Sequence, residues 1–119
     1  MGNSCVDQAI LTKLRGLIGE KVLRKLITLF LEDVPKKINS AIQSEKSGDL
    51  ESVSSIAHSL ISSTGSLGAV DMQKLSERIE ALAEQRKAGE VSALLPELAD
   101  AYQKAKVIFE EDRSLKGGA

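Results

Sequence analysis

Apolar residues recur at intervals of three and four along nearly the whole of this 119-residue chain. That spacing places side chains on one face of an α-helix, whereas a strand requires strict alternation. Four substantial amphipathic segments follow one another, separated by short turns that contain glycine. Because short connections make neighbouring helices antiparallel, the pattern predicts an all-α, up-and-down antiparallel four-helix bundle.

The first third of the chain predicts two helices of different length. A short additional N-terminal helix is expected over residues 10–18, with Gly16 and Gly19 as its stop. The next apolar stripe stays in phase across Pro35, so we expect one long helix with a kink there rather than two helices. Asp49 is suited to cap the helix that follows. The inward-facing residues expected in the long helix are Leu23, Leu26, Ile27, Phe30, Val34, Ile38, Ala41 and Ile42.

The length of the chain fits a single domain with one core. We expect an N-terminal tail over residues 1–6 and the helical bundle over residues 7–112. Residues 113–119 lack apolar periodicity and are expected to form a flexible C-terminal tail.

Composition disfavours several classes of function. Sixteen basic and seventeen acidic residues give a formal charge of −1, so the chain has no electrostatic footprint for nucleic acid or an anionic membrane. One His and one Cys are too few for a metal site built from these residues, and one Cys allows no internal disulfide. The absence of a signal-like start and of paired cysteines makes a cytoplasmic protein the expectation.

The segment from Ser52 to Val70 contains no Asp, Glu, Lys or Arg, although 28% of the chain is charged. Its many serines make it too polar for a membrane span, and a central helix buried on several sides is one interpretation. At about 100° per residue, however, its apolar residues lie opposite His58, the only histidine. This helical-wheel projection therefore predicts that His58 faces outward and is not a core histidine.

Small, uncharged residues share the face of His58. Ser54 and Ser62 lie one turn on either side, Ser55 lies three residues before and Gly65 seven residues after. A glycine inside a helix costs about 1 kcal/mol relative to alanine, so Gly65 suggests that something approaches the backbone closely. The sequence does not exclude that His58 is an incidental surface histidine. However, a face made of small residues around an exposed histidine is accessible to a bulky partner and is interpreted as a docking platform.

One accessible histidine limits the chemistry that the chain can perform. The sequence has no G-x-S-x-G nucleophile elbow and no G-x-x-x-x-G-K-[ST] phosphate loop, so a hydrolase or a nucleotide-binding protein is disfavoured. A neutral imidazole can instead act alone as a nucleophile and accept a phosphoryl group. This role needs access more than it needs a cleft.

The run from Ala57 to Ala69, AHSLISSTGSLGA, resembles the signature of histidine-containing phosphotransfer (HPt) domains, commonly A-H-x-L-K-G-S-S-x-x-L-G-A. Leu29-Phe30 with Asp33-Val34-Pro35 resembles the second helix of that family, and Gly48-Asp49 its usual turn. Ile79-Glu80 falls where the family often has Leu-Glu or a Gln. The resemblance covers roughly residues 7–112.

The resemblance implies a four-helix bundle that carries phosphoryl groups between receiver-domain aspartates and has no kinase activity of its own. His58 would be the phospho-acceptor through Nε2, and Ser62 would hold the small position one turn later. Glu80 would accept a hydrogen bond from Nδ1–H, although an ordinary solvated carboxylate is an equal alternative. Ser54, Ser55, Ile61, Ser62 and Gly65 would contact the partner. The implied partners are receiver domains of response regulators or a hybrid sensor histidine kinase. The protein is expected to be a monomer. No cofactor is expected on this chain, because Mg²⁺ would be bound only by the receiver.

The sequence departs from the family at Ile61, where a lysine is usual three residues after the histidine. Ile61 could enlarge an apolar docking surface or pack at the edge of the bundle, and the sequence leaves both open. The missing cation is also consistent with a different function, a helical docking module that binds a receiver domain or kinase without carrying phosphate.

Overall fold

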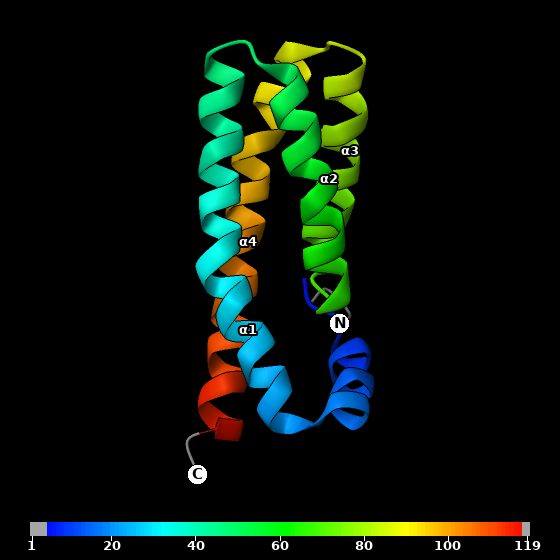
Figure 1. Cartoon of the computed structure of the whole chain (residues 1–119), viewed down its shortest axis with the longest axis vertical. Coiled ribbons are helices and arrows are strands. Elements are labelled where there is room, and N and C mark those ends of the chain that lie inside the picture. Colours follow the sequence, from blue (N-terminus) through cyan, green and yellow to red (C-terminus); the bar gives the residue numbers. More distant parts are fainter. Residues whose placement is uncertain (1–4, 118–119) are drawn as a thin grey trace.

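The structure is a computed structural model that describes residues 5–117, with side chains for residues 5–112. Residues 5–117 form four helices and no strand: α1 (Gln8–Lys46), α2 (Leu50–Ser66), α3 (Val70–Glu84) and α4 (Ala88–Gly117). The helices run alternately up and down, and each packs against its neighbours in a ring that α4 closes against α1 (Figure 1). The prediction of an all-helical, four-helix fold is confirmed.

Local side-chain and backbone hydrogen bonds set the ends of these helices. The carboxylate of Asp49 accepts from the backbone N–H of Ser52 at 3.0 Å, which caps α2 as the sequence predicts. Each of the first three helices ends in a turn whose central residue has a positive φ: Gly48 at 80°, Gly68 at 81° and Arg86 at 62°. This left-handed conformation stops a helix and turns the chain towards the next one.

Helix α1 changes direction at Gly19, where φ is 86° and ψ is 162°. The φ and ψ angles remain helical at Pro35, so the prediction of one continuous helix across Pro35 holds, and Figure 1 shows that α1 also changes direction, less sharply, in its cyan part. The short helix expected over residues 10–18 is not separate: residues 8–18 form the part of α1 before the bend and lie beyond the turn between α2 and α3, at one end of the bundle (Figure 1). Two contacts anchor this arm: Asp7 N–H donates to Gly68 O at 2.8 Å, and Arg15 pairs with Asp112 at 2.7 Å.

The core is mainly aliphatic and is closed by three aromatic side chains. The ring of Phe30 lies 5.0 Å from that of Phe109 and 6.1 Å from that of Tyr102, measured between centroids. The hydroxyl of Tyr102 donates to Leu31 O at 3.2 Å and thereby links α4 to α1. These contacts fix the ring of helices around the one core that the chain length allows.

The packed region extends beyond the expected bounds of the bundle. Cys5 and Val6, assigned by the sequence to an N-terminal tail, are buried as members of the hydrophobic core. Helix α4 continues to Gly117 and so includes most of the expected C-terminal tail, while residues 1–4 and 118–119 lie outside the described residues. Within the described range, no helix has the length and apolar character needed to cross a membrane.

Candidate functional site

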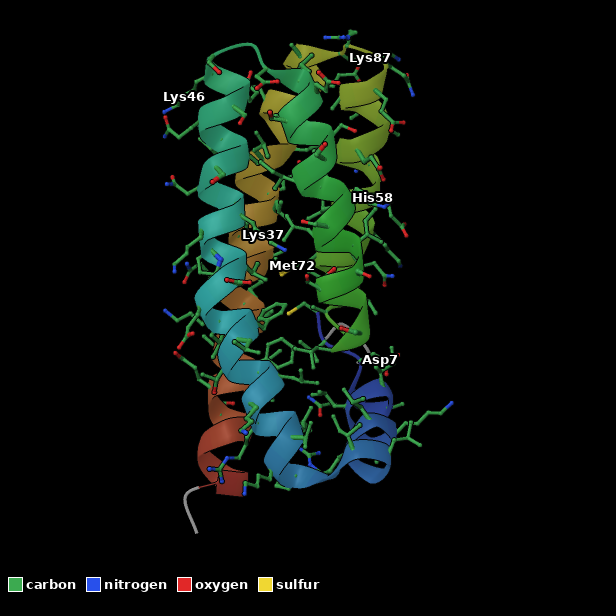
Figure 2. The ribbon with its side chains drawn as sticks, in the orientation of Figure 1. Asp7, Lys37, Lys46, His58, Met72 and Lys87 are labelled. Carbon is green, nitrogen blue, oxygen red and sulfur yellow. The ribbon has the colours of Figure 1, made fainter. Side chains whose placement is uncertain are left out.

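His58 stands on the solvent face of α2, near the middle of the bundle (Figure 2). Its side chain is 75% exposed, whereas Val53 and Leu60 on the opposite face of the helix are buried. The outward orientation predicted from the helical wheel is therefore correct. Because the imidazole is exposed, a second macromolecule can approach it without any opening of the bundle.

Glu80 on α3 fixes the orientation of that imidazole. His58 Nδ1 lies 2.9 Å from Glu80 Oε2, and the Glu80 side chain is only 22% exposed. An ionised carboxylate can only accept, so Nδ1 carries the donated proton. In a neutral imidazole with this tautomer, the lone pair of Nε2 is left free on the side away from Glu80. Sequence reasoning left open whether Glu80 was a solvated carboxylate, and the contact answers that question.

The small residues predicted around His58 lie on the accessible surface of α2. Ser55 and Ser62 are exposed, and Ser54 is half-buried, with its hydroxyl 3.5 Å from Glu84 Oε2. Ser62 lies one turn after His58, where a long side chain would project over the imidazole. These positions leave room for a partner around Nε2.

Ile61 is half-buried and does not belong to the buried core cluster. It lies three residues after His58, so the two side chains are neighbours on the helix surface. Helix α2 contains no lysine or arginine, and the cation usual at this position is therefore not replaced by another within the helix. Ile61 adds apolar surface beside the histidine.

Gly65 has a role inside the protein that the sequence did not reveal. A Cβ atom on Gly65 would lie 2.5 Å from Nε2 of Gln73, so the absence of a side chain lets Gln73 of α3 lie against α2. The close approach inferred from this mid-helix glycine is thus made by the protein itself. The pairing of Gln73 with Gly65 could have been found from the antiparallel register that also joins Glu80 to His58.

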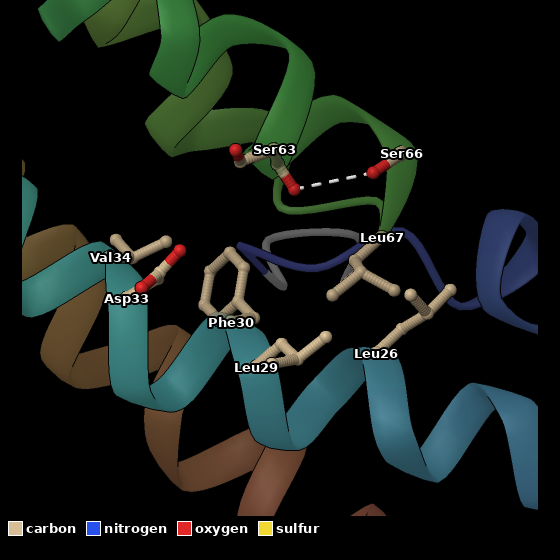
Figure 3. A pocket seen from close by; sticks show the side chains of 8 residues that line it. All are labelled: Leu26, Leu29, Phe30, Asp33, Val34, Ser63, Ser66 and Leu67. Carbon is tan, nitrogen blue, oxygen red and sulfur yellow. Dashed lines mark hydrogen bonds between the residues drawn. The ribbon is translucent and has the colours of Figure 1, made fainter.

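A shallow apolar groove lies between α1 and the C-terminal end of α2, where Ser63 and Ser66 line it (Figure 3). Leu26 and Leu29 of α1 line it with 38% and 56% of their surfaces exposed, which corrects the expectation that Leu26 points into the core. Leu67 and Phe30 form its apolar base, and Asp33 is its one charged lining residue. Sequence reasoning missed this groove because three- and four-residue spacing does not distinguish the core side of a stripe from its edge.

Apart from His58 and Glu80, the described titratable residues give no sign of a metal centre. Among the residues that the structure describes, no three His, Cys, Asp or Glu side chains are placed to hold a metal ion. Cys5 is buried and free, and burial followed by the nearby charge of Asp71 raises the pKa of its thiol. The pair formed by His58 and Glu80 is the candidate site.

An exposed histidine on a helical bundle, oriented by a carboxylate of the next helix, is consistent with the motif noted in the sequence, and the family model for the Hpt domain matches residues 25–107. The chain belongs to the Hpt domain family. Members of this family are phosphocarriers of phosphorelays and interact with receiver domains.

A solved structure shares the fold of the chain. The crystal structure of histidine-containing phosphotransfer protein B (HptB) from Pseudomonas aeruginosa PAO1 matches with a TM-score of 0.90 and 19% sequence identity. The match covers 96% of this chain and 97% of that one, so the arm of α1 lies within a shared fold. No curated protein sequence matches the chain.

Proposed function

We propose that this Hpt protein is a phosphorelay intermediate that accepts a phosphoryl group on His58 from a receiver-domain aspartate and passes it to another receiver. The observation that carries the proposal is the exposed imidazole whose Nδ1 is held by Glu80 at 2.9 Å. This geometry directs the one free nitrogen, Nε2, towards solvent and an incoming partner.

The transfer step balances without any further reagent. The lone pair of Nε2 attacks the phosphorus of the aspartyl phosphate, so an N–P bond forms while the P–O bond to the aspartate breaks and the carboxylate leaves. Throughout the step the Nδ1 proton stays with the ring and its positive charge is stabilised by Glu80. Reversal of the same step on a second receiver regenerates neutral His58.

The residues around His58 are proposed to act by position rather than by chemistry. Ser62 leaves space for the phosphoryl group, and the partner would contact Ser54, Ser55, Ile61 and the surface near Gly65. Positioning and electrostatics supply most of the catalysis in phosphoryl transfer. We therefore assign Mg²⁺ to the receiver alone and assign no kinase activity to this chain.

The proposal includes a cytoplasmic monomer whose partners are receiver domains of response regulators or of a hybrid sensor kinase. Support for this comes from the single free cysteine and from the site itself, which is complete within one chain. We further propose that the receiver also contacts the apolar groove between α1 and α2.

Phosphotransfer from an isotopically labelled receiver tests the assignment. Receiver domains from the same organism are phosphorylated and incubated with the wild type and with His58→Gln, which keeps a polar side chain but lacks the nucleophile. We expect acid-labile, alkali-stable label on the wild type only. Label on both proteins, or on neither with any receiver, contradicts the role of His58.

A second candidate function is a docking module that binds a receiver or kinase without carrying phosphate. The observation that favours it is Ile61, which leaves α2 without a cation beside His58. Binding of a receiver by both the wild type and His58→Gln, with no label on either, would identify the docking module.

A further inference from the structure

The turn between α3 and α4 holds an arginine where the other two turns of the bundle hold glycine. In all three turns the N–H of the positive-φ residue donates to the carbonyl three residues earlier, and the next N–H donates to the carbonyl five residues earlier. Gly48 and Gly68 occupy the positive-φ position in two turns, and Arg86 occupies it in the third with φ at 62°. Glycine adopts this conformation without steric cost, whereas a residue with a Cβ does not.

Arg86 lies beside the face that presents His58. It lines a surface pocket together with Ser54 and Ser55 of α2 and Glu84 of α3. Ser54 lies one helical turn, about 6 Å of rise, from His58. Figure 2 labels His58 and Lys87, the neighbour of Arg86, and places the turn at the end of the bundle beyond α2 and α3.

None of the ion pairs found among the described residues includes a charged residue of this pocket. Glu51 and Glu84 also line it, yet Arg86 makes no ion pair within 4 Å among the described residues. Arg86 is the one basic residue of the pocket, and α2 provides none. The pocket therefore offers an unpaired guanidinium and two carboxylates to a partner that docks on His58.

We propose that Arg86 is a specificity-determining residue that pairs with a carboxylate on the docking face of the receiver domain, next to the site of phosphoryl transfer. This inference rests on the proposed function, and it names the chemistry of the partner: an acidic side chain opposite Arg86. A charge at the rim of an interface mainly changes the association rate and its dependence on salt. Arg86 is the one residue of this pocket whose charge can attract such a carboxylate.

The variant Arg86→Gly separates this role from a structural one, since glycine suits the turn and removes the charge. We expect kcat/KM for transfer from a phosphorylated receiver to fall about fivefold at low ionic strength, through KM and not kcat. The difference in kcat/KM between the wild type and Arg86→Gly should disappear near 1 M salt, where the screening length is about 3 Å. Arg86→Lys should stay close to wild type, and Arg78→Ala, an exposed arginine elsewhere on α3, should have no effect.

Thermal unfolding of the same proteins completes the test. A cation near a helix C-terminus interacts favourably with the helix dipole. If the role of Arg86 were purely structural, its removal would therefore lower the midpoint temperature of unfolding. We expect the midpoint of Arg86→Gly to equal or exceed that of the wild type, because the turn then contains the residue it favours. An unchanged KM, or a deficit that salt does not reduce, overturns the proposal.

A failure of the proposed function can be recognised separately. If no receiver labels the wild type, the affinities of the same receivers for the wild type and Arg86→Gly are measured directly. Weaker binding by the variant then retains the role of Arg86 in docking, while equal binding, or none by either protein, overturns it.

Discussion

Replacement of Gly68 by alanine tests how the N-terminal arm is joined to the turn that sets His58 against Glu80. Gly68 has φ at 81°, and its carbonyl accepts from Asp7 N–H at 2.8 Å. A Cβ atom at this position would lie 2.9 Å from the backbone oxygen of Asp7 and 3.2 Å from Cβ of Ile10. Alanine therefore meets backbone that cannot rotate away, and the arm must shift.

Gly48 provides a matched control for the conformational cost. Its φ is 80°, and a Cβ atom there would meet no other atom within 4 Å. The positive φ costs alanine about 1–2 kcal/mol, and the smaller entropy of the unfolded chain returns about 0.4–1 kcal/mol. We expect Gly48→Ala to lower the free energy of unfolding by about 0.5–1 kcal/mol.

Gly68→Ala adds two further costs to that conformational penalty. Displacement of Asp7 weakens a hydrogen bond worth about 1 kcal/mol, and overpacking of a close contact costs about 1–3 kcal/mol. Together with the conformational penalty, the total expected loss is about 2.5–5 kcal/mol, which is more than twice the effect of the control.

Urea unfolding of the two variants, followed by circular dichroism, measures the difference. A loss in Gly68→Ala that is no larger than in Gly48→Ala would refute the reasoning, because only the contact with the arm distinguishes the two glycines. A larger loss in Gly68→Ala, accompanied by faster amide exchange in residues 8–18, is the expected result.

Three further variants examine the site and its supports. Ser62→Arg should slow transfer to His58 at least tenfold, since an exposed long side chain one turn away obstructs Nε2, while circular dichroism shows an unchanged helical spectrum. Leu29→Asp places a charge in the apolar groove and should raise KM for the receiver about tenfold, as burial of a leucine side chain contributes about 1.5–3 kcal/mol, with kcat retained. Hydrogen bonds from the Ser52 hydroxyl and then its backbone N–H lower the pKa of Asp49 below its ordinary value of 3.8. That carboxylate therefore stabilises the fold above the ordinary value and loses the contribution as pH falls through the lowered pKa, so the stability difference between wild type and Asp49→Asn should shrink on acidification.

The sequence was sufficient to predict the helices and the orientation of His58, because both depend on local periodicity. The apolar residues of α2 lie opposite the imidazole, and this follows from 3.6 residues per turn alone. The cap at Asp49 was also predictable, since it depends on residues three apart.

Features that depend on contacts between distant segments were not predictable in this way. Helix α1 leaves helical backbone geometry at Gly19 and not at Pro35, because only a residue without a Cβ readily adopts φ of 86°, whereas a proline within a helix can keep helical φ and ψ. The exposure of Leu26 and the filling of the space at Gly65 by Gln73 likewise depend on where neighbouring helices lie. The motif indicated Glu80, but its hydrogen bond required the register of α2 against α3.

Restoration of a cation at Ile61 tests what its absence means for the phosphorylated protein. Side chains three residues apart on a helix lie about 5–6 Å apart at Cβ, so a lysine at this position can bring its ammonium group close to phosphate on Nε2 of His58. At about 6 Å, opposite unit charges interact by about 0.7 kcal/mol in water and about 3 kcal/mol at an effective dielectric constant of 20. Because His58 is 75% exposed, we expect a value near the lower end.

Ile61→Lys should therefore lengthen the half-life of the phosphorylated protein about threefold at low ionic strength, with the gain lost at high salt. Ile61→Met is the matched control, since it supplies a long unbranched side chain without charge. Decay of acid-labile label after removal of the receiver measures both variants against the wild type. Equal half-lives for Ile61→Lys and Ile61→Met would show that a cation at this position does not stabilise phosphohistidine. Longer retention by Ile61→Lys alone would mean that the natural isoleucine keeps the phosphoryl group on His58 short-lived, as suits a carrier that must release it to the next receiver.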